Sequence, residues 1–159
     1  MNSNVVPANP NTYRNNMIGI LNHYLANLAM TITNLYNFHW NVTDPLFILI
    51  HEKTEEYYTR LQAFYDEIAE RIKMLNGHPL TTLDQYIHHS VVKNYESRNY
   101  NAQAIIREII SNFEILLSIA QEIGNMATGV NDMNTIDIIT NHISFFEKQL
   151  WMLKAQLLN

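Results

Sequence analysis

The chain contains very few residues that interrupt helices. It has four glycines and four prolines among 159 residues, less than half of the roughly 12% that these residues usually make up. A sandwich or barrel of short strands needs frequent turns built from such residues, so these folds are disfavoured. The length is typical of one domain with a sizeable core, and neither an internal repeat nor a linker indicates a second domain.

Apolar residues recur at steps of three and four along most of the chain, the spacing of amphipathic helices. Thr43, Asp44 and Pro45 are interpreted as the end of one helix and the start of the next. Gly124 and Gly129 are expected to frame the loop before the last helix. The predicted helices are Tyr13–Asn41, Pro45–Leu75, Thr82–His89, Asn99–Asn125 and Asp132–Leu158.

These helices predict an all-α fold, a four-helix bundle in which one long crossover carries a short extra helix. Residues 1–12 are expected to form a flexible tail, and residues 13–159 the single bundle domain. On the first two long helices, the side chains expected to face the core include Met17, Leu21, Tyr24, Leu25, Leu28, Ile32, Leu35, His39, Ile50, Thr54, Tyr57, Leu61, Phe64 or Tyr65, Ile68, Ile72 and Leu75.

The composition excludes several classes of function. The absence of cysteine excludes disulfides, thiolate zinc sites, iron–sulfur clusters and cysteine nucleophiles, and it is compatible with the cytoplasm, where we expect the protein. The longest apolar run, Leu46–Ile50, is far shorter than the ~20 residues of a membrane span. Residues 1–16 lack the apolar stretch of a signal peptide. The net charge is −5, and only Arg14 among the ten basic residues precedes Lys53, so no basic patch for nucleic acid is visible.

The second predicted helix carries two pairs of metal-binding residues. His51 and Glu55 are four residues apart, as are Asp66 and Glu70, so each pair can face one point. The pairs are separated by roughly 22 Å along the helix, so one chain cannot unite them. All four residues nevertheless lie in one strip about 100° wide, rotated by roughly 130° from the core stripe. No histidine follows a glutamate by three positions, which excludes the usual di-iron arrangement within one bundle.

A two-fold axis can unite the two pairs. When this helix lies antiparallel to its own copy, one register brings His51 near Glu70 of the partner subunit, and Glu55 near the partner's Asp66. His39, at the end of the first helix, can complete each site. Nitrogen and carboxylate ligands with open positions suit Fe(II), Mn(II) or Zn(II). Spacing alone leaves two alternatives open, a solvated acidic face and a hydrogen-bonded core histidine.

At these residues the sequence resembles the Dps family, DNA-binding proteins from starved cells, which are also called mini-ferritins. The resemblance covers nearly the whole chain after residue 12. The motifs that carry it are Phe38-His39-Trp40-Asn41-Val42, His51-Glu52 with Glu55, Asp66-Glu67-Ile68-Ala69-Glu70-Arg71, Gly77-His78-Pro79-Leu80, Thr135-Ile136-Asp137, Glu147-Lys148 and Trp151-Met152-Leu153.

The resemblance implies a ferritin-like bundle that assembles, through two-fold dimers, into a hollow dodecamer. It implies a ferroxidase that oxidises Fe(II), commonly with hydrogen peroxide, stores Fe(III) inside the shell and protects against oxidative damage. Dioxygen is the alternative oxidant. The implied catalytic iron ligands are His39 and His51 of one chain with Asp66 and Glu70 of its partner, and Glu55 is a further acid of the site. Trp40 is an auxiliary electron donor or, alternatively, a core aromatic residue.

Three further expectations follow from the resemblance. Asp132 and Asp137 match acids of the three-fold pores through which iron enters, although Asp132 also fits a helix N-cap. Asn141 replaces the third pore acid, which leaves the pore less negative. Residues 1–12 contain no Lys or Arg, so strong DNA binding is not expected. Alternative functions are a non-catalytic shell that acts as an antigen or interaction partner, and a nucleoid-associated DNA binder.

Overall fold

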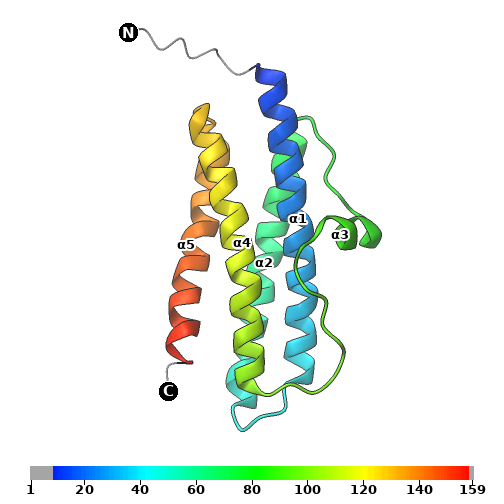
Figure 1. The fold of residues 1–159 in the computed structure, drawn as a ribbon, viewed down its shortest axis with the longest axis vertical. Coiled ribbons are helices and arrows are strands. Elements are labelled where there is room, and N and C mark those ends of the chain that lie inside the picture. Colours follow the sequence, from blue (N-terminus) through cyan, green and yellow to red (C-terminus); the bar gives the residue numbers. More distant parts are fainter. Residues whose placement is uncertain (1–8, 158–159) are drawn as a thin grey trace.

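A computed structural model describes residues 9–157 as a bundle of four long helices with a fifth short one (Figure 1). The described residues contain no strand, and one isolated bridge joins Val42 to Tyr100. The expected all-α bundle is therefore confirmed, whereas residues 1–8 of the predicted tail, which spans residues 1–12, lie outside the described part. The helices are α1 (Pro10–Asn41), α2 (Phe47–Met74), α3 (Leu83–His89), α4 (Ala102–Gly129) and α5 (Met133–Ala155).

The helices form two antiparallel pairs. A short turn joins α1 to α2, a second short turn joins α4 to α5, and α1 also packs against α4. The connection between α2 and α4 returns along the full length of the bundle and carries α3, which lies against α1 (Figure 1). Among the described residues, no helix is long and apolar enough to cross a membrane.

Side-chain caps explain most of the helix starts. Asn9 accepts a hydrogen bond from the backbone N–H of Asn11, and Pro10 occupies the first turn, where it needs no donor. α1 therefore begins three residues before the predicted start, within the segment expected to be a tail. Asn101 caps α4 in the same way, two residues after the predicted start of that helix.

The turn between α1 and α2 differs slightly from the prediction. α2 begins at Phe47, because Asp44 accepts a hydrogen bond from Leu46 N (2.9 Å) and holds Pro45 in the turn. The other carboxylate oxygen of Asp44 accepts from Ala102 N (3.0 Å) at the start of α4. These backbone donors lower the pKa of Asp44. One carboxylate thus fixes the end of the bundle at which α1, α2 and α4 meet.

Gly124 does not end α4, and its predicted place in a loop is wrong. The helix continues to Gly129 and lies close to Ile139 and Ile143 of α5 at this glycine. One glycine costs a helix only about 1 kcal/mol relative to alanine. Ile123, next to Gly124, and Ala127, one turn later, are both buried, and their burial offsets this free-energy cost.

The core follows the predicted stripes of α1 and α2. Nearly all of the predicted positions are buried, and the exceptions are Ile32, Tyr65 and Leu75, which are partly buried. Aromatic rings from three helices fill the middle of the bundle, where Tyr57 and Phe64 of α2 meet Phe113 of α4 and Phe146 of α5.

A buried ion pair ties α2 to the start of α5. Arg71 donates to both carboxylate oxygens of Asp132 at 2.9 and 3.0 Å and to the hydroxyl of Thr135 at 2.9 Å. Tyr13 of α1 donates to the same carboxylate at 2.8 Å. The carboxylate also accepts from Thr135 N, so Asp132 is the N-terminal cap of α5. Burial on its own raises the pKa of Asp132, but the hydrogen bonds outweigh it and hold this pKa below its usual range.

Replacing Asp132 with alanine removes this cap and leaves a buried guanidinium unpaired. We expect the free energy of unfolding at pH 7 to fall by roughly 3 kcal/mol, as for other broken buried ion pairs, measured by denaturant titration. Asp137→Ala, which removes an exposed acid of the same helix, should change it by less than about 0.5 kcal/mol. Because the folded-state pKa of Asp132 is lowered, its stabilisation is present above the ordinary aspartate pKa and lost as the pH falls through the folded-state value. Equal stabilities of the two variants would contradict this role.

Candidate metal centre

Two imidazole rings lie face to face across the turn between α1 and α2. His39 lies in the last turn of α1, His51 lies in the first turns of α2, and the ring centroids are 3.7 Å apart with an interplanar angle of 20°. His39 is buried and His51 is partly buried. Twelve residues separate them in sequence, so the tight turn fixed by Asp44 brings them together.

Each ring is held by the backbone of the other residue. His39 Nδ1 lies 2.8 Å from the carbonyl oxygen of His51, and His51 Nδ1 lies 2.9 Å from the carbonyl oxygen of His39. Since a carbonyl oxygen can only accept, both Nδ1 atoms carry the proton and donate. In a neutral imidazole, Nε2 then keeps its lone pair. Histidines that bind metals are commonly fixed in this way, through a bond from the second ring nitrogen.

Thr54 supports the pair from the next turn of α2. Its buried hydroxyl donates to the carbonyl oxygen of Ile50 at 2.7 Å and lies 3.2 Å from His39 Nδ1. The sequence places Thr54 in the core stripe, which is correct, but the stripe gives no indication of its contact with the imidazole.

The predicted acidic ligands lie exposed on α2, and two of them, Asp66 and Glu70, lie away from the histidine pair. Asp66 and Glu70 are one helical turn apart, and Glu55 lies one turn after His51. None of these three carboxylates makes a side-chain hydrogen bond or ion pair within residues 9–157. Other acids of the chain do, among them Glu56 with Lys53 and Glu114 with Lys154. These three acids are therefore free to bind a cation.

One chain does not assemble a complete site. Within residues 9–157, no three His, Asp or Glu side chains lie close enough together to hold one metal ion. The structure brings His39 and His51 together. On α2, Asp66 lies about 22 Å from His51 at 1.5 Å per residue, and Glu70 lies one turn beyond Asp66. Each half of the candidate centre thus needs atoms from outside its own chain.

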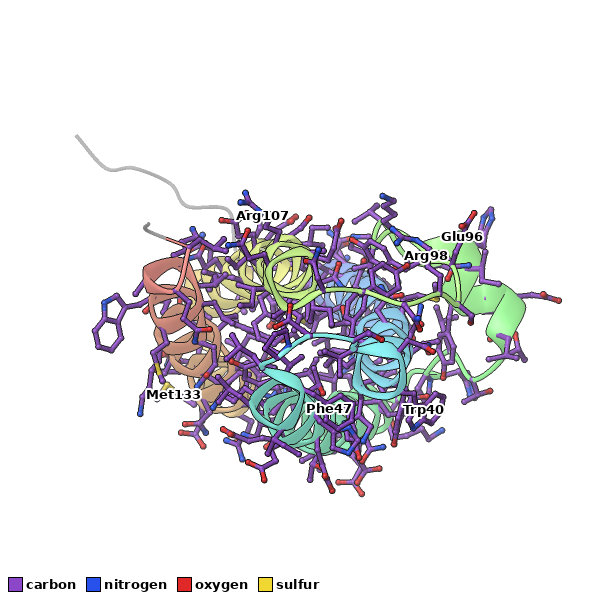
Figure 2. The ribbon with its side chains drawn as sticks, turned by 90° about the horizontal axis from the view of Figure 1, so that it is seen from below. Trp40, Phe47, Glu96, Arg98, Arg107 and Met133 are labelled. Atoms are coloured by element: carbon purple, nitrogen blue, oxygen red, sulfur yellow. The ribbon has the colours of Figure 1, made fainter. Side chains whose placement is uncertain are left out.

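Exposed apolar side chains lie close in sequence to His51. Phe47 stacks on His51 with ring centroids 5.1 Å apart, and Leu46, Ile48 and Leu49 next to it are exposed. Figure 2 shows Phe47 and Trp40 at the end of the bundle where α1 meets α2. Clustered exposed apolar side chains are typical of a surface that another protein covers.

Trp40 is not a core residue of its own chain, since 69% of it is exposed. Its ring stacks on Tyr36 at 5.3 Å, Tyr36 stacks on Tyr58 at 4.2 Å, and Tyr58 meets His39 edge-on at 5.4 Å. Aromatic rings therefore connect His39 with Trp40. The sequence motif singled out Trp40 but not the two tyrosines, which come together only after α1 and α2 pack.

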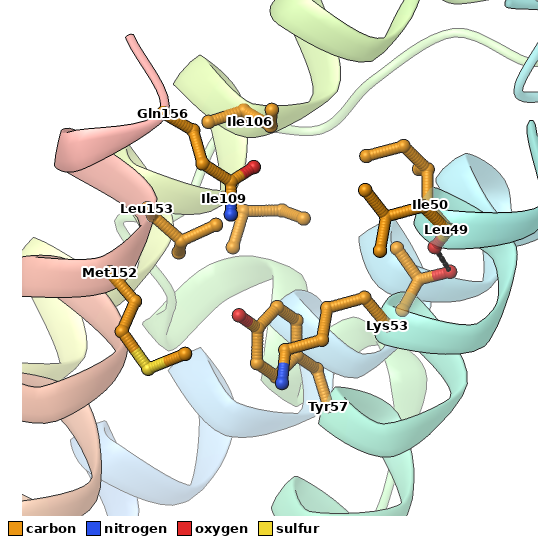
Figure 3. A pocket seen from close by; sticks show the side chains of 10 residues that line it. Leu49, Ile50, Lys53, Tyr57, Ile106, Ile109, Met152, Leu153 and Gln156 are labelled. Carbon is orange, nitrogen blue, oxygen red and sulfur yellow. Dashed lines mark hydrogen bonds between the residues drawn. The ribbon is translucent and has the colours of Figure 1, made fainter. Parts of the chain in front are cut away.

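A small pocket near this end of the bundle has a different character. It has a volume of about 210 Å³, opens between α2, α4 and α5, and is lined mainly by aliphatic side chains (Figure 3). Among the described residues that line it, Lys53 is the one charged side chain, and its Nζ lies 2.7 Å from Glu56 and above the ring of Tyr57. The pocket contains no histidine or carboxylate and is not the candidate centre.

The two predicted pore acids have unlike surroundings. Asp132 caps α5 and binds Arg71 and Tyr13, so its carboxylate already has a structural role. Asp137 is exposed on α5, as is Asn141 one turn later. The pore assignment remains a prediction for both acids, and Asp137 is the one whose carboxylate makes no side-chain bond among the described residues.

Comparisons with known proteins concern the family and the fold of the chain. The profile of the ferritin-like domain matches residues 18–159. The DNA protection during starvation protein of Helicobacter pylori is 33% identical over 87% of this chain and 96% of its own length. The DNA protection during starvation protein 2 of Bacillus anthracis is also 33% identical, over 87% of this chain and 94% of its own length. The crystal structure of a Dps protein from Vibrio cholerae, described as a member of the ferritin-like diiron-carboxylate superfamily, superposes with a TM-score of 0.89. It is 31% identical, with 92% of this chain and 91% of that chain covered.

The hydrogen bonds of the histidine pair predict the tautomer of each ring. At neutral pH, ¹⁵N solid-state NMR should show His39 and His51 protonated on Nδ1, with an unprotonated Nε2. His142 provides an internal control, because its Nε2 faces the carboxylate of Glu67 and should carry the proton instead. Spectra of His39→Gln and His51→Gln assign the signals. Nε2-protonated rings at positions 39 and 51 would contradict the proposed ligand geometry.

Proposed function

Since this chain belongs to the Dps branch of the ferritin-like family, we propose that it is a ferroxidase and iron-storage protein. It oxidises Fe(II) at sites shared between two subunits and stores Fe(III) within a hollow shell, which protects the cell from oxidative damage. The observation that carries this proposal is the pair of reciprocal bonds between His39 and His51. They direct both Nδ1 protons into the protein and leave two Nε2 lone pairs for a cation.

The second half of the site comes from a two-fold related copy. An antiparallel arrangement of α2 against its own copy, centred between Arg60 and Leu61, places His51 near the partner's Glu70. Asp66 and Glu70 are exposed and make no side-chain hydrogen bond or ion pair within residues 9–157, which supports this contact, as does the apolar surface at Leu46–Leu49. Such an isologous dimer has two equivalent sites, each with imidazole from one chain and carboxylate from the other. Glu55 is a further acid of the same site.

These ligands suit iron as a substrate. Carboxylate oxygen and imidazole nitrogen hold Fe(II) in a partly open shell, to which an oxidant has access. Two Fe(II) ions each supply one electron to one hydrogen peroxide, and the O–O bond breaks. With two water molecules the products are two FeOOH units and four protons. Both electrons reach one peroxide, so no hydroxyl radical is released.

Assembly and iron uptake complete the proposal. The two-fold dimers build a dodecamer whose interior holds the Fe(III) mineral, and the protein acts in the cytoplasm. Iron enters at three-fold pores, where Asp137 presents its exposed carboxylate. Asn141 weakens the negative charge of that route, and the bonds of Asp132 to Arg71 weaken it further. Hydrogen peroxide is the proposed oxidant, and dioxygen is the alternative.

Nucleoid binding is a weaker candidate for this chain. DNA affinity depends largely on the neutralisation of phosphates by Lys and Arg. The net charge of −5 and the absence of Lys and Arg from residues 1–12 leave the chain without that contribution. The names of the relatives describe DNA protection, which the removal of Fe(II) and peroxide also provides.

Removal of the acidic half-site tests the proposed function. In the double variant Asp66→Asn/Glu70→Gln, we expect the initial rate of Fe(II) oxidation by peroxide to fall by more than about 100-fold, since loss of groups one shell outside a metal already costs about 10–100-fold. Stopped-flow absorbance of Fe(III) measures the rate. Light scattering should show an unchanged assembly, because asparagine and glutamine keep the size and shape of the side chains that they replace.

The matched control is Glu52→Gln/Glu56→Gln. It removes the same charge at the same spacing from exposed positions of the same helix. Its oxidation rate should stay within a factor of about three of the parent, because neither carboxylate is a proposed iron ligand. Its stability should change little, because a surface ion pair such as Lys53–Glu56 contributes only about 0–1 kcal/mol. An unchanged rate in the Asp66/Glu70 variant would exclude these residues as ligands.

A further inference from the structure

The pocket between α2, α4 and α5 has no part in the proposed iron site. Its volume is about 210 Å³, and it lies where the helix pair that contains α2 faces the pair formed by α4 and α5. Side chains of α2 form one wall, side chains of α5 form the other, and two isoleucines of α4 lie between them (Figure 3). The apolar side chains that line it are Leu49, Ile50, Ile106, Ile109, Met152 and Leu153.

The hydroxyl groups in the wall of this pocket already have partners in the protein. Thr54 donates to the carbonyl oxygen of Ile50 at 2.7 Å, and Tyr57 donates to the amide oxygen of Gln149 at 3.1 Å. A buried water usually makes about three hydrogen bonds, whereas an apolar cavity of about 150 Å³ stays dry and binds benzene. The pocket therefore favours an apolar group over water.

One positive charge lies at the pocket. The side chain of Lys53 is 29% exposed, and its Nζ lies 2.7 Å from Glu56 and 5.2 Å from the ring centroid of Tyr57. A lysine ammonium has three N–H donors, and within residues 9–157 its one hydrogen-bond acceptor is Glu56. Glu56 itself does not line the pocket. The ammonium can therefore donate to an anionic group that enters beside it.

The pocket faces away from the histidine pair. Leu49 and Lys53 each lie two positions from His51, which places them about 160° round α2 from it at 3.6 residues per turn. Leu49 also belongs to the exposed apolar segment Leu46–Leu49, so the rim of the pocket borders that surface. Among the described residues that line the pocket there is no proposed iron ligand.

We propose that this pocket binds an unbranched alkyl carboxylate of medium length, such as octanoate. The alkyl chain lies among the apolar side chains of the three helices, and the carboxylate accepts hydrogen bonds from Lys53 Nζ. Apolar walls with a few placed polar groups are typical of ligand sites, and a volume below the roughly 300–1,000 Å³ of sites for drug-sized molecules favours a small ligand with one chain. The proposal is independent of the ferroxidase function.

Calorimetric titration of the assembled protein with alkyl carboxylates tests this proposal. We expect saturable binding of one octanoate per subunit. The affinity should rise by about 15-fold from hexanoate to octanoate, because each further methylene that is buried strengthens binding by about fourfold. Chains that exceed the length of the pocket should gain nothing more.

Substitution at the rim tests the location of the site. Leu49→Trp places a large side chain at the mouth, and it should weaken octanoate binding by at least about tenfold. Leu49 is 53% exposed, so the larger side chain does not require the core to repack. The matched control is Leu83→Trp, at a position of α3 that is 78% exposed and lies outside the pocket, and it should leave the affinity unchanged.

The role of the charge has its own readout. Lys53→Gln should weaken octanoate by up to about fivefold, the range of an exposed ion pair, and should leave the affinity for the uncharged octanol unchanged. Glu56→Gln should strengthen octanoate by a similar factor, because it frees the ammonium. Lys73→Gln removes the same charge from an exposed position of α2 outside the pocket, and it should affect neither ligand.

Three outcomes would overturn the proposal. The first is no saturable binding of octanoate to the assembled protein, which is the result expected if a side chain of a neighbouring subunit fills the pocket. The second is octanoate binding that Leu49→Trp does not weaken, and the third is an equal effect of Lys53→Gln on octanoate and octanol. The comparison of chain lengths uses the parent protein, so it remains decisive even if a variant fails to fold.

Discussion

The reciprocal hydrogen bonds between His39 and His51 are the constraint on which the candidate centre depends. Each ring donates to the backbone carbonyl of the other residue, so neither bond forms unless α1 ends and α2 begins at the observed positions. Asp44 sets those positions by binding Leu46 N and Ala102 N. The geometry of the imidazoles is thus determined by the backbone of the turn rather than by a flexible loop.

A second feature is the contrast between acids that have partners and acids that do not. Asp132 binds Arg71, and Glu67 binds His142, so these carboxylates belong to the internal structure of the chain. Asp66 and Glu70 have no such bonds among the described residues and lie on the exposed side of α2. Because unpaired acids contribute little to the folding of one chain, their arrangement is better explained by a function that another subunit completes.

The sequence was sufficient for the helices and the core, because both follow from the spacing of apolar residues. It failed at Gly124, which stays helical because α5 packs against it, a tertiary contact. It also missed a local signal at Pro10, which is helical because Asn9 caps the chain. The candidate ligands were recognisable from spacing and motif, whereas the roles of Thr54 and His142 were not. Both lie on apolar stripes, and their hydrogen bonds exist only after separate helices meet.

The central claim is that each iron site takes histidines from one subunit and carboxylates from its partner. Co-assembly of two inactive proteins, His39→Gln/His51→Gln and Asp66→Asn/Glu70→Gln, tests it most directly. Random mixing makes half of the dimers mixed, and each mixed dimer contains one complete site, so about a quarter of the parent oxidation rate should return. If mass spectrometry shows mixed dimers and the rate stays at the level of the separate variants, the shared site is contradicted.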